Sequence, residues 1–386
     1  MFHISFNENP HSTRSSHKST TPFVVHTIVY LRLEVTAEVR TCIALSVVGL
    51  TELSLSAVST PDEMKAVVLD HFGGLDALVF KELPTPEPKK GQVLIQVKAF
   101  GLNHAEVHMR KGEWAEAATV IGIECVGLVS ACPGGEFEVG RKVAAAMGGM
   151  GRTINGSYAE YTCVPAANVV GIDVDMPWAD LAALPETYAT SWTCLFRNLE
   201  LQAGQLLLIR GATSALGQAA LKLAVNVGAK VIATSRNPAR FQQLLDLGAV
   251  RAELEGPDLS KRLPEAKSVD GVLNLIGNSV LLDSVAIPRR GGRVCHAGWL
   301  GGLAPVENFD PLLQMASGVH FSLFASPHFG LPQFPLHDVP LASIAADVAA
   351  GRLDAKPARV FKFEDIREAH RVMESNEANG KIVVVL

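Results

Sequence analysis

The hydrophobic pattern is clearest in the middle of the chain, where apolar runs alternate with polar turns. Residues 206–210 form an apolar run that predicts a buried strand, and the small residues of 211–217 predict a tight turn. Apolar positions with helical spacing over 215–227 and an apolar run at 230–234 predict a helix and a second strand, followed by a helix over 238–247. Strand, turn, helix and strand in this order indicate a βαβ unit.

The same alternation continues toward the C-terminus. Residues 269–275 predict a strand, 280–288 a helix, and 291–298 another strand with a glycine-rich exit. Alternating strands and helices predict a doubly wound parallel sheet with helices on both faces. Such a sheet binds its ligand at the carboxyl ends of the strands.

The two flanks of this region predict a second domain that is rich in strands. The expected strands cover 64–69, 79–82, 93–99, 126–129, 142–146 and 158–164, with one helix over 104–111 that Gly112 ends. Two helices are expected between residues 179 and 199. A strand at 360–363, a helix at 366–375 and a strand at 381–386 are expected to return to this domain, because a closing strand needs a sheet to join.

Residues 1–63 keep no sustained helical or strand period and are rich in Ser and Thr. No apolar run there reaches the ~18 residues that a membrane helix needs. Arg14, Lys18 and Arg32 leave a presequence open as one interpretation. The strand pattern that begins at Met64 favours the other, in which 1–63 is a poorly ordered leader or an extension outside the functional enzyme.

Composition narrows the class of protein. The chain of 386 residues has a formal net charge of -5 and a pI near 6.2, so it lacks the basic field that a nucleic-acid partner requires. Its six cysteines show no C-x-x-C spacing, which argues against a disulfide framework and favours a reducing compartment. A cytoplasmic location is expected, or a mitochondrial one if 1–63 is a presequence.

The turn at 211–217 is the first chemical candidate. Small residues let a backbone approach a pyrophosphate closely, and the helix behind the turn directs free N–H groups at the same anion. The small positions at the right spacing are Gly211, Ser214 and Gly217, so the strict G-x-G-x-x-G pattern is not met. An ordinary strand-to-helix turn is the alternative, and the return strand at 230–234 favours dinucleotide binding.

The end of that return strand indicates which dinucleotide binds. Ser235 and Arg236 stand where an NAD-binding protein usually carries an acidic residue, and Arg240 follows one helical turn later. The next carboxylate along the chain is Asp246. A guanidinium offers a planar charged fork to a 2′-phosphate, so NADPH is expected rather than NADH.

Several segments together resemble the zinc-free quinone oxidoreductase-like branch of the medium-chain dehydrogenase/reductase superfamily. They read MKAVVLDHFGG from Met64, GLNHAEVHMRKG, LPETYATSW, GATSALGQAA, GGRVCHAGWLGG and IREAHRVMESNEANGKIVV. The resemblance implies an α/β fold in which a Rossmann domain interrupts a GroES-like β-barrel catalytic domain. The implied catalytic domain covers 64–185 and 326–386, the NADP-binding domain covers 186–325, and NADPH and substrate are expected between them.

The resemblance also bears on zinc. Zinc-dependent relatives hold a catalytic metal through an early cysteine and a Gly-His-Glu motif. Here Asn103 stands near the first position and Ile123 replaces the histidine at the second, and isoleucine cannot ligate a metal. His104 and His108 have i, i+4 spacing but no third assigned ligand. No metal site is therefore expected.

Individual site residues follow from the same motifs. Asn103 matches the asparagine beside the nicotinamide and substrate, His108 stands where quinone reductases often carry a tyrosine, and Tyr188 lies near the expected nicotinamide contact; these three are the candidate catalytic residues. Glu106 and Arg110 are expected to form a structural ion pair. The candidate cofactor-binding residues are Gly211, Ala212, Thr213, Ser214, Ala215, Leu216, Gly217, Ser235, Arg236, Arg240, Gly298, Trp299, Phe324, Ser326, Asn379 and Lys381.

Without a metal to polarise an isolated carbonyl, acceptors that delocalise charge themselves are favoured. The expected function is NADPH-dependent hydride transfer to a quinone or an α,β-unsaturated carbonyl, without zinc. A pathway-specific enoyl reductase or an alcohol dehydrogenase-like enzyme of secondary metabolism would share these motifs, and a non-catalytic NADPH-binding protein is the third interpretation. The expected partners are a small-molecule substrate and a second copy of the chain, paired through the strand GVHFSLFA.

Overall fold

The computed structural model of the chain describes residues 60–114 and 116–386. The expected leader therefore lies outside the described residues except for its last four positions. Strand β1 (Glu63–Leu69) begins one residue before Met64, and the Asp62 carbonyl accepts a hydrogen bond from the Thr85 N–H at 2.9 Å. Residues just before Met64 thus take part in the folded unit, which spans Thr60–Leu386.

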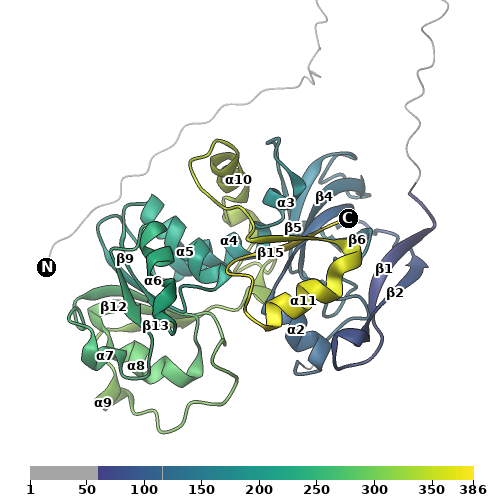
Figure 1. Ribbon diagram of the computed structural model, residues 1–386. Helices are drawn as coiled ribbons and strands as arrows, with labels where there is room; N and C mark the ends of the chain where they lie inside the picture. The colour runs from purple at the N-terminus through teal and green to yellow at the C-terminus, as the bar shows by residue number, and fades with distance from the viewer. Residues whose placement is uncertain (1–59, 115) are drawn as a thin grey trace, which may run out of the picture. The chain divides into compact units, whose positions relative to one another are not determined.

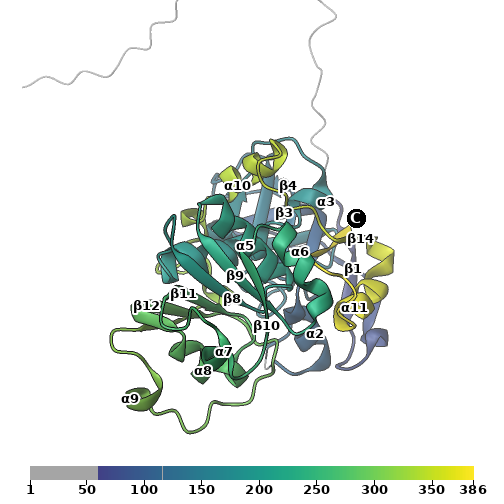
Figure 2. The same ribbon diagram turned by 60° about the vertical axis from the view of Figure 1, so that its left-hand side comes forward.

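A six-stranded parallel sheet occupies the middle of the chain, as the alternating pattern predicts. Its strands in spatial order are β10 (Arg251–Leu254), β9 (Lys230–Ser235), β8 (Leu206–Arg210), β11 (Val269–Asn274), β12 (Pro288–His296) and β13 (His320–Leu323), and Figure 2 shows β8 to β12 side by side. The order runs outward in both directions from β8, which is the doubly wound arrangement of a Rossmann domain. The predicted fold class is confirmed here.

Helices cover both faces of this sheet (Figure 1). They are α5 (Ala215–Asn226), α6 (Phe241–Asp246), α7 (Leu259–Arg262) and α8 (Leu281–Ala286). The short helix α9 (Pro311–Gln314) buries none of its residues. Within β8, Leu207 and Ile209 are buried in the large core with the apolar face of α5, whereas Leu208 joins a separate cluster with residues of α7 and α8. Both faces of the strand are apolar because both are covered.

The flanking segments form a mainly antiparallel sheet together with a hairpin. The hairpin pairs β1 with β2 (Leu78–Pro84). The strands of the larger sheet follow one another in the spatial order β14 (Arg359–Lys362), β15 (Ile382–Val385), β3 (Gln92–Leu102), β4 (Glu124–Ala131), β5 (Lys142–Ala146) and β7 (Val169–Gly171). Strand β6 (Tyr161–Pro165) belongs to the same sheet and also pairs with β3. The strand expected from residue 158 starts only at Tyr161. The Tyr158 carbonyl instead accepts from the Val67 N–H of β1 at 2.8 Å, which ties the hairpin to the sheet.

The remaining helices connect these sheets. They are α2 (His104–Lys111), α3 (Trp178–Leu181), α4 (Pro185–Trp192), α10 (Leu341–Ala349) and α11 (Ile366–Glu374), and α4 continues as a π-helical turn over Thr193–Asn198. Gly112 ends α2 at φ 71°, as predicted. Short 3-10 turns lie at Leu75–Ala77, Ala166–Asn168, Pro238–Arg240, Asn278–Val280, Ser326–His328, Leu336–Asp338 and Phe363–Asp365. None of the described helices is long and apolar enough to cross a membrane.

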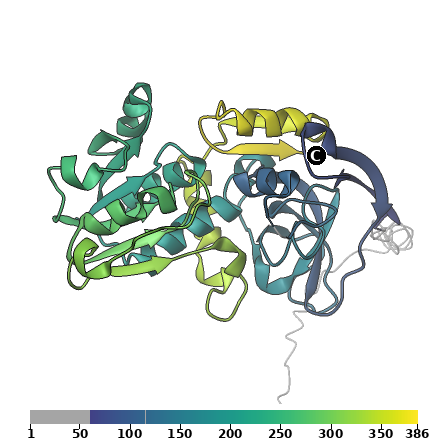
Figure 3. The same cartoon turned by 90° about the horizontal axis from the view of Figure 1, so that it is seen from below.

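The C-terminal segment returns to the antiparallel sheet, as expected. Strand β15 lies between β14 and β3, and Ile382 faces Leu102 in the register of the β15–β3 pair. Figure 3 shows this segment, in yellow, against the first strands and helix of the chain. Because β3 leads directly into Asn103, this pairing brings the start of β15 beside the start of α2.

Candidate active site

Three side chains far apart in the sequence meet where β3 ends and β15 begins. The Lys381 ammonium donates to Asn103 Oδ1 at 2.6 Å and to Glu124 Oε1 at 2.5 Å, and Asn103 Nδ2 donates to the same Glu124 oxygen at 2.9 Å. Lys381 and Glu124 are buried, with 7% and 0% of their surface exposed. A buried charge pair needs such additional hydrogen bonds to be tolerated. The sequence motifs named Asn103 and Lys381 separately, and the structure brings them together.

Glu106 lies directly beside this cluster. Its two carboxyl oxygens accept from the backbone N–H groups of Asn103 at 2.8 Å and Ile123 at 3.2 Å. Burial raises the pKa of Glu106 to about 8, opposed by backbone hydrogen bonds and by Lys381. The expected ion pair between Glu106 and Arg110 is wrong, because the Arg110 guanidinium pairs with Glu374.

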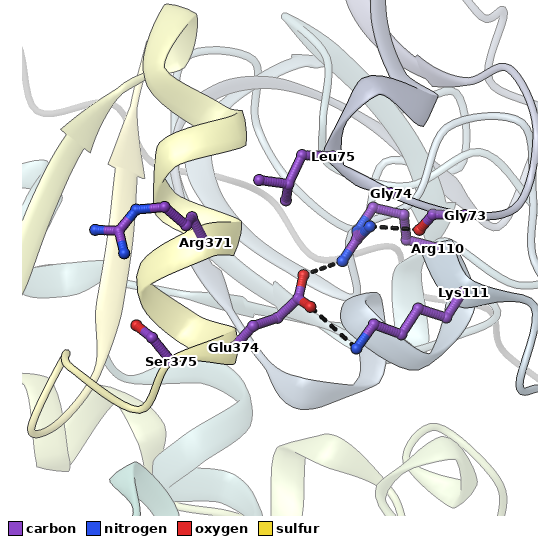
Figure 4. A pocket seen from close by; sticks show the side chains of 8 residues that line it. All are labelled: Gly73, Gly74, Leu75, Arg110, Lys111, Arg371, Glu374 and Ser375. Carbon is purple, nitrogen blue, oxygen red and sulfur yellow. Dashed lines mark hydrogen bonds and ion pairs between the residues drawn. The ribbon is translucent and has the colours of Figure 1, made fainter.

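Arg110 instead points to the opposite side of α2. Its guanidinium pairs with Glu374 of α11 and donates to the Gly73 carbonyl at 2.5 Å. These groups line a surface hollow of about 610 Å³, in which Glu374 lies between Arg110 and Lys111 (Figure 4). None of the candidate catalytic or cofactor-binding residues lines this hollow, and its cations are paired with glutamates, so it is not the site that the motifs indicate.

His108 is held in one orientation by two neighbours. Its Nδ1 lies 2.5 Å from a carboxylate oxygen of Glu113, and its ring lies nearly parallel to that of Trp114, with ring centroids 5.5 Å apart and 9° between the planes. Since Nδ1 is engaged, Nε2 is the nitrogen left to face a ligand. His104 lies one turn earlier, and desolvation, with smaller contributions from His108 and Lys381, lowers its pKa. No sequence pattern singles out Glu113.

The first turn of α4 lies against the same cluster. The backbone N–H of Glu186 donates to Glu124 Oε2 at 2.8 Å, and the Thr190 hydroxyl donates to Glu186 Oε1 at 3.1 Å. Tyr188 is buried on another side of the helix. Burial raises the pKa of its phenol, and the charged group that contributes to the shift is Asp354, not a member of the cluster. The structure thus brings Glu186 and Thr190 to the site, and the catalytic role expected of Tyr188 stays a prediction.

The small-residue turn between β8 and α5 has the geometry of a pyrophosphate cradle. Gly211 has φ +81°, and a Cβ atom on Gly217 would lie 2.6 Å from the Gly211 carbonyl oxygen, so both positions require glycine. The hydroxyl of Ser214 accepts from the Gly217 N–H at 3.0 Å and caps α5. Ala212 is buried, whereas Thr213, Ala215 and Leu216 are half-buried. The residues present therefore fit a dinucleotide although the strict motif is absent.

The end of β9 presents the expected basic groups. Arg236 is exposed, and the side chain of Ser235 accepts from the Asn237 N–H at 3.1 Å. Arg240 Nε donates to Gln243 Oε1 at 2.9 Å, while its buried Nη2 has no partner among the described residues. The exposed Arg236 guanidinium is available to an anion such as a 2′-phosphate.

A buried charge network that the sequence did not indicate lies beneath this turn. Arg210, with 0% exposure, donates to Glu255 at the end of β10 and to Asp283 in α8 at 2.7 Å. Glu255 also accepts from the Thr234 hydroxyl at 2.5 Å, and that hydroxyl accepts from the Gly211 N–H at 3.1 Å. A carboxylate thus stands near the end of β9 after all, contributed by the neighbouring strand and paired with Arg210.

The other candidate cofactor contacts lie at the exits of β12 and β13. A Cβ atom on Gly298 would lie 2.5 Å from the Leu275 carbonyl oxygen. The Trp299 ring packs edge-on against the His296 ring, with the ring centroids 5.5 Å apart. Phe324 is buried against Phe329 and Phe334, as a core aromatic residue.

The last two candidates belong to the segments that follow β13 and precede β15. The Ser326 hydroxyl reaches Glu186 closely enough to lower the pKa of that carboxyl. Asn379 is exposed and adopts φ 60°, and its carbonyl accepts from Gln218 Nε2 of α5 at 3.0 Å. Gln218 also donates to the Thr213 carbonyl at 3.0 Å, so it joins the pyrophosphate turn to the segment that carries Lys381.

The described residues contain no group of three or more His, Cys, Asp or Glu side chains placed to hold a metal ion. Ile123, at the position of the missing ligand, is buried, and its backbone N–H binds Glu106. The expectation of a zinc-free site remains a prediction.

The family models and the relatives that match this chain all describe dehydrogenases or oxidoreductases, or contain a region similar to them. Residues 89–174 match the alcohol dehydrogenase GroES-like domain, and residues 256–384 match the family described as zinc-binding dehydrogenase. Human quinone oxidoreductase is 26% identical over 334 residues, which cover 84% of this chain and 98% of that protein. A phenolphthiocerol/phthiocerol polyketide synthase of Mycobacterium tuberculosis is 31% identical over 82% of this chain, a match that covers 14% of the synthase polypeptide.

Solved structures agree with this result. A structure titled NAD-dependent alcohol dehydrogenase has a TM-score of 0.69 and 28% identity, covering 84% of this chain and 100% of that one. A mycobacterial structure complexed with NADPH has a TM-score of 0.71 and 23% identity, with 84% and 99% coverage, and supports the fold. The chain belongs to the medium-chain dehydrogenase/reductase superfamily of nicotinamide-dependent oxidoreductases.

Proposed function

We propose that this protein is an NADPH-dependent reductase of quinones or α,β-unsaturated carbonyl compounds that works without zinc. The observation that carries the proposal is the cluster of Lys381, Asn103 and Glu124. Asn103 and Glu124 stand at the two positions where zinc-dependent relatives have ligand motifs, and here the Lys381 ammonium bridges them. Ile123 supplies no donor atom for a metal. The carboxylate of Glu124 is neutralised by Lys381 and is thereby withdrawn from metal binding.

The absence of a Lewis acid from the proposed mechanism restricts the substrate. An isolated ketone needs a metal or a strong hydrogen-bond donor to stabilise the charge that develops on its oxygen. A quinone or a conjugated enone spreads that charge over its own π system. Conjugated acceptors therefore suit a site that works without a metal.

The groups at the end of β9 support NADPH over NADH. Arg236 is exposed there, Arg240 has a nitrogen without a partner among the described residues, and the nearby carboxylate of Glu255 is bound by Arg210. A free carboxylate would attract the ribose hydroxyl of NAD and repel a phosphate, whereas paired Glu255 does neither. When bound, the reduced nicotinamide supplies a hydride.

The chain's own residues orient the acceptor and hold protons. Asn103, fixed by Lys381 and Glu124, forms the floor at the nicotinamide end of the site. His108 presents Nε2 to the acceptor oxygen, because Glu113 holds Nδ1 and Trp114 holds the plane of the ring. With Nδ1–H donated to Glu113, Nε2 donates to this oxygen only in the doubly protonated form of the ring, and that form stabilises the negative charge as it develops.

The test is oxidation of NADPH followed by absorbance, with a 1,2-quinone, a 1,4-quinone, a 2-alkenal and a simple ketone, each with and without a chelator. We expect turnover with the conjugated acceptors, none with the ketone, and no effect of the chelator. Inhibition by the chelator would contradict the zinc-free assignment. Measurable NADPH binding without turnover of any acceptor would favour a non-catalytic NADPH-binding protein.

A second candidate within the same chemistry is a pathway-specific enoyl reductase. The match to a polyketide synthase at 31% identity favours it. A thioester-linked enoyl substrate reduced much faster than a free 2-alkenal would identify this function.

We further propose a homodimer in the cytoplasm. Strand β13 is one of the two edges of the parallel sheet, and Phe321 and Leu323 on it are 45% and 56% exposed. An exposed apolar edge strand is a template for pairing with another chain. The five cysteines among the described residues are free, in keeping with a reducing compartment.

A further inference from the structure

Glu186 is a carboxyl group for which the proposed mechanism has no use, and it lies at the meeting point of three segments. It stands in the first turn of α4, its Oε1 accepts from Thr190, and Ser326 approaches it from the segment that follows β13. Its backbone N–H is bound to Glu124 and thus to the cluster that fixes Asn103. The residue is half-buried and lies beside the cluster that holds Asn103.

The surroundings of Glu186 favour its protonated form. Burial raises the pKa of the carboxyl, Lys381 opposes the rise and Glu124 adds to it, while Thr190 and Ser326 lower the pKa by hydrogen bonding. Cys194, one turn beyond Thr190, is another titratable group whose pKa is influenced by Glu186. A carboxyl group that accepts from Thr190 beside this cluster is positioned to give up a proton, and the same hydrogen bond stabilises the anion that remains.

We infer that the Glu186 carboxyl is the proton donor to the carbon next to the carbonyl group when a conjugated enone or enal is reduced. The inference rests on the proposed function and makes enones and enals the preferred substrates. Hydride from the reduced nicotinamide adds to the β-carbon and leaves an enolate. The enolate forms a new C–H bond at its α-carbon with the Glu186 proton, the O–H bond of Glu186 breaks, and water returns a proton to the carboxylate.

Quinone reduction provides an internal comparison. Both protons of a hydroquinone end on oxygen atoms, which exchange protons with water without a positioned acid. Carbon protonation is slow and benefits from a positioned acid by about 10²-fold or more. The same variant should therefore affect the two substrate classes differently.

The experiment compares wild type with Glu186→Gln on a 2-alkenal and on a 1,4-quinone. We expect kcat with the alkenal to fall about 100-fold and kcat with the quinone to change less than about 3-fold. In D₂O the wild type should place deuterium on one face of the α-carbon, and the residual product of the variant should carry it on both faces. Glu186→Asp should recover part of the alkenal activity, since it retains the acid.

Three results would overturn the inference: equal loss for both substrates, unchanged alkenal turnover, or a wild type that reduces quinones but not alkenals. A wild type that reduces neither substrate would instead refute the proposed function. The matched control is Glu160→Gln, because Glu160 is also half-buried and binds the Lys65 N–H at 2.8 Å away from the site. Melting temperature and NADPH binding, followed by fluorescence, should be the same for Glu186→Gln and wild type.

Discussion

Replacing Arg210 by methionine tests whether the buried charge network supports the dinucleotide turn. Methionine keeps much of the side-chain volume but leaves Glu255 and Asp283, whose side chains are 4% and 8% exposed, without their cation. Removing one partner of a buried ion pair typically costs about 3–5 kcal/mol. At roughly 2–4 °C per kcal/mol for a domain of this size class, the melting temperature should fall by about 6–20 °C.

The assay is thermal unfolding followed by circular dichroism at one fixed scan rate, with NADPH binding as a second measurement. Binding should also weaken, because Glu255 holds Thr234, and Thr234 holds the Gly211 N–H. The triple variant with Glu255→Gln and Asp283→Asn should regain most of the lost stability, since no buried charge is then left unpaired.

Arg371→Met is the matched control for this experiment. Arg371 also pairs with two carboxylates, Glu368 and Glu377, but its side chain is 45% exposed. Exposed pairs contribute about 0–1 kcal/mol, so this variant should melt within about 4 °C of wild type. If Arg210→Met shifted the melting temperature no more than Arg371→Met does, the network would not have the structural role assigned to it.

Three further predictions concern the site and the sheet edge. Arg236→Ala should weaken NADPH binding at least about 10-fold more than NADH binding, measured by fluorescence titration; an equal loss would remove the 2′-phosphate assignment. Because the pKa of Glu106 is raised from 4.5 to about 8, the folded state keeps a proton that the unfolded state loses, so the free energy of unfolding should fall as pH rises from about 4.5 to 8. Glu106→Gln should show a smaller fall in urea midpoint over this range, and an identical fall in both proteins would contradict the assignment. Phe321→Glu on β13 should convert a dimer to a monomer by light scattering, whereas a wild type that is already monomeric would exclude pairing through this edge.

Local patterns in the sequence predicted the regular elements well. The apolar runs predicted β8, β9 and β5, and the pattern of α2 with its glycine end was found as predicted. Helix α10 was not predicted, because Pro340 precedes it and no side chain caps its start. Strand β10 is only four residues long and lies at the edge of the sheet, where alternation is too brief to recognise.

The chemistry of the site depended on contacts that no local pattern contains. Asn103 was identified from its motif, but its partner Lys381 is 278 residues away, and only the pairing of β15 with β3 brings them together. The role of Glu106 was wrong because a carboxylate four residues before an arginine suggests an ion pair, whereas α2 directs the two side chains to different partners. Glu186 was missed since its significance comes from its tertiary neighbours.

The separation of Lys381 from its partners also sets the order in which the site is assembled during synthesis. Lys381 follows Glu124 by 257 positions, and the stretch between them includes the whole parallel sheet, whose strands are contiguous in the chain. At about 5–20 residues per second, the ribosome needs on the order of 10–50 s to make this stretch. Throughout that interval the buried carboxylate of Glu124 lacks its cation and β3 lacks one neighbouring strand. The nascent chain therefore carries an open sheet edge at β3 until β15 arrives.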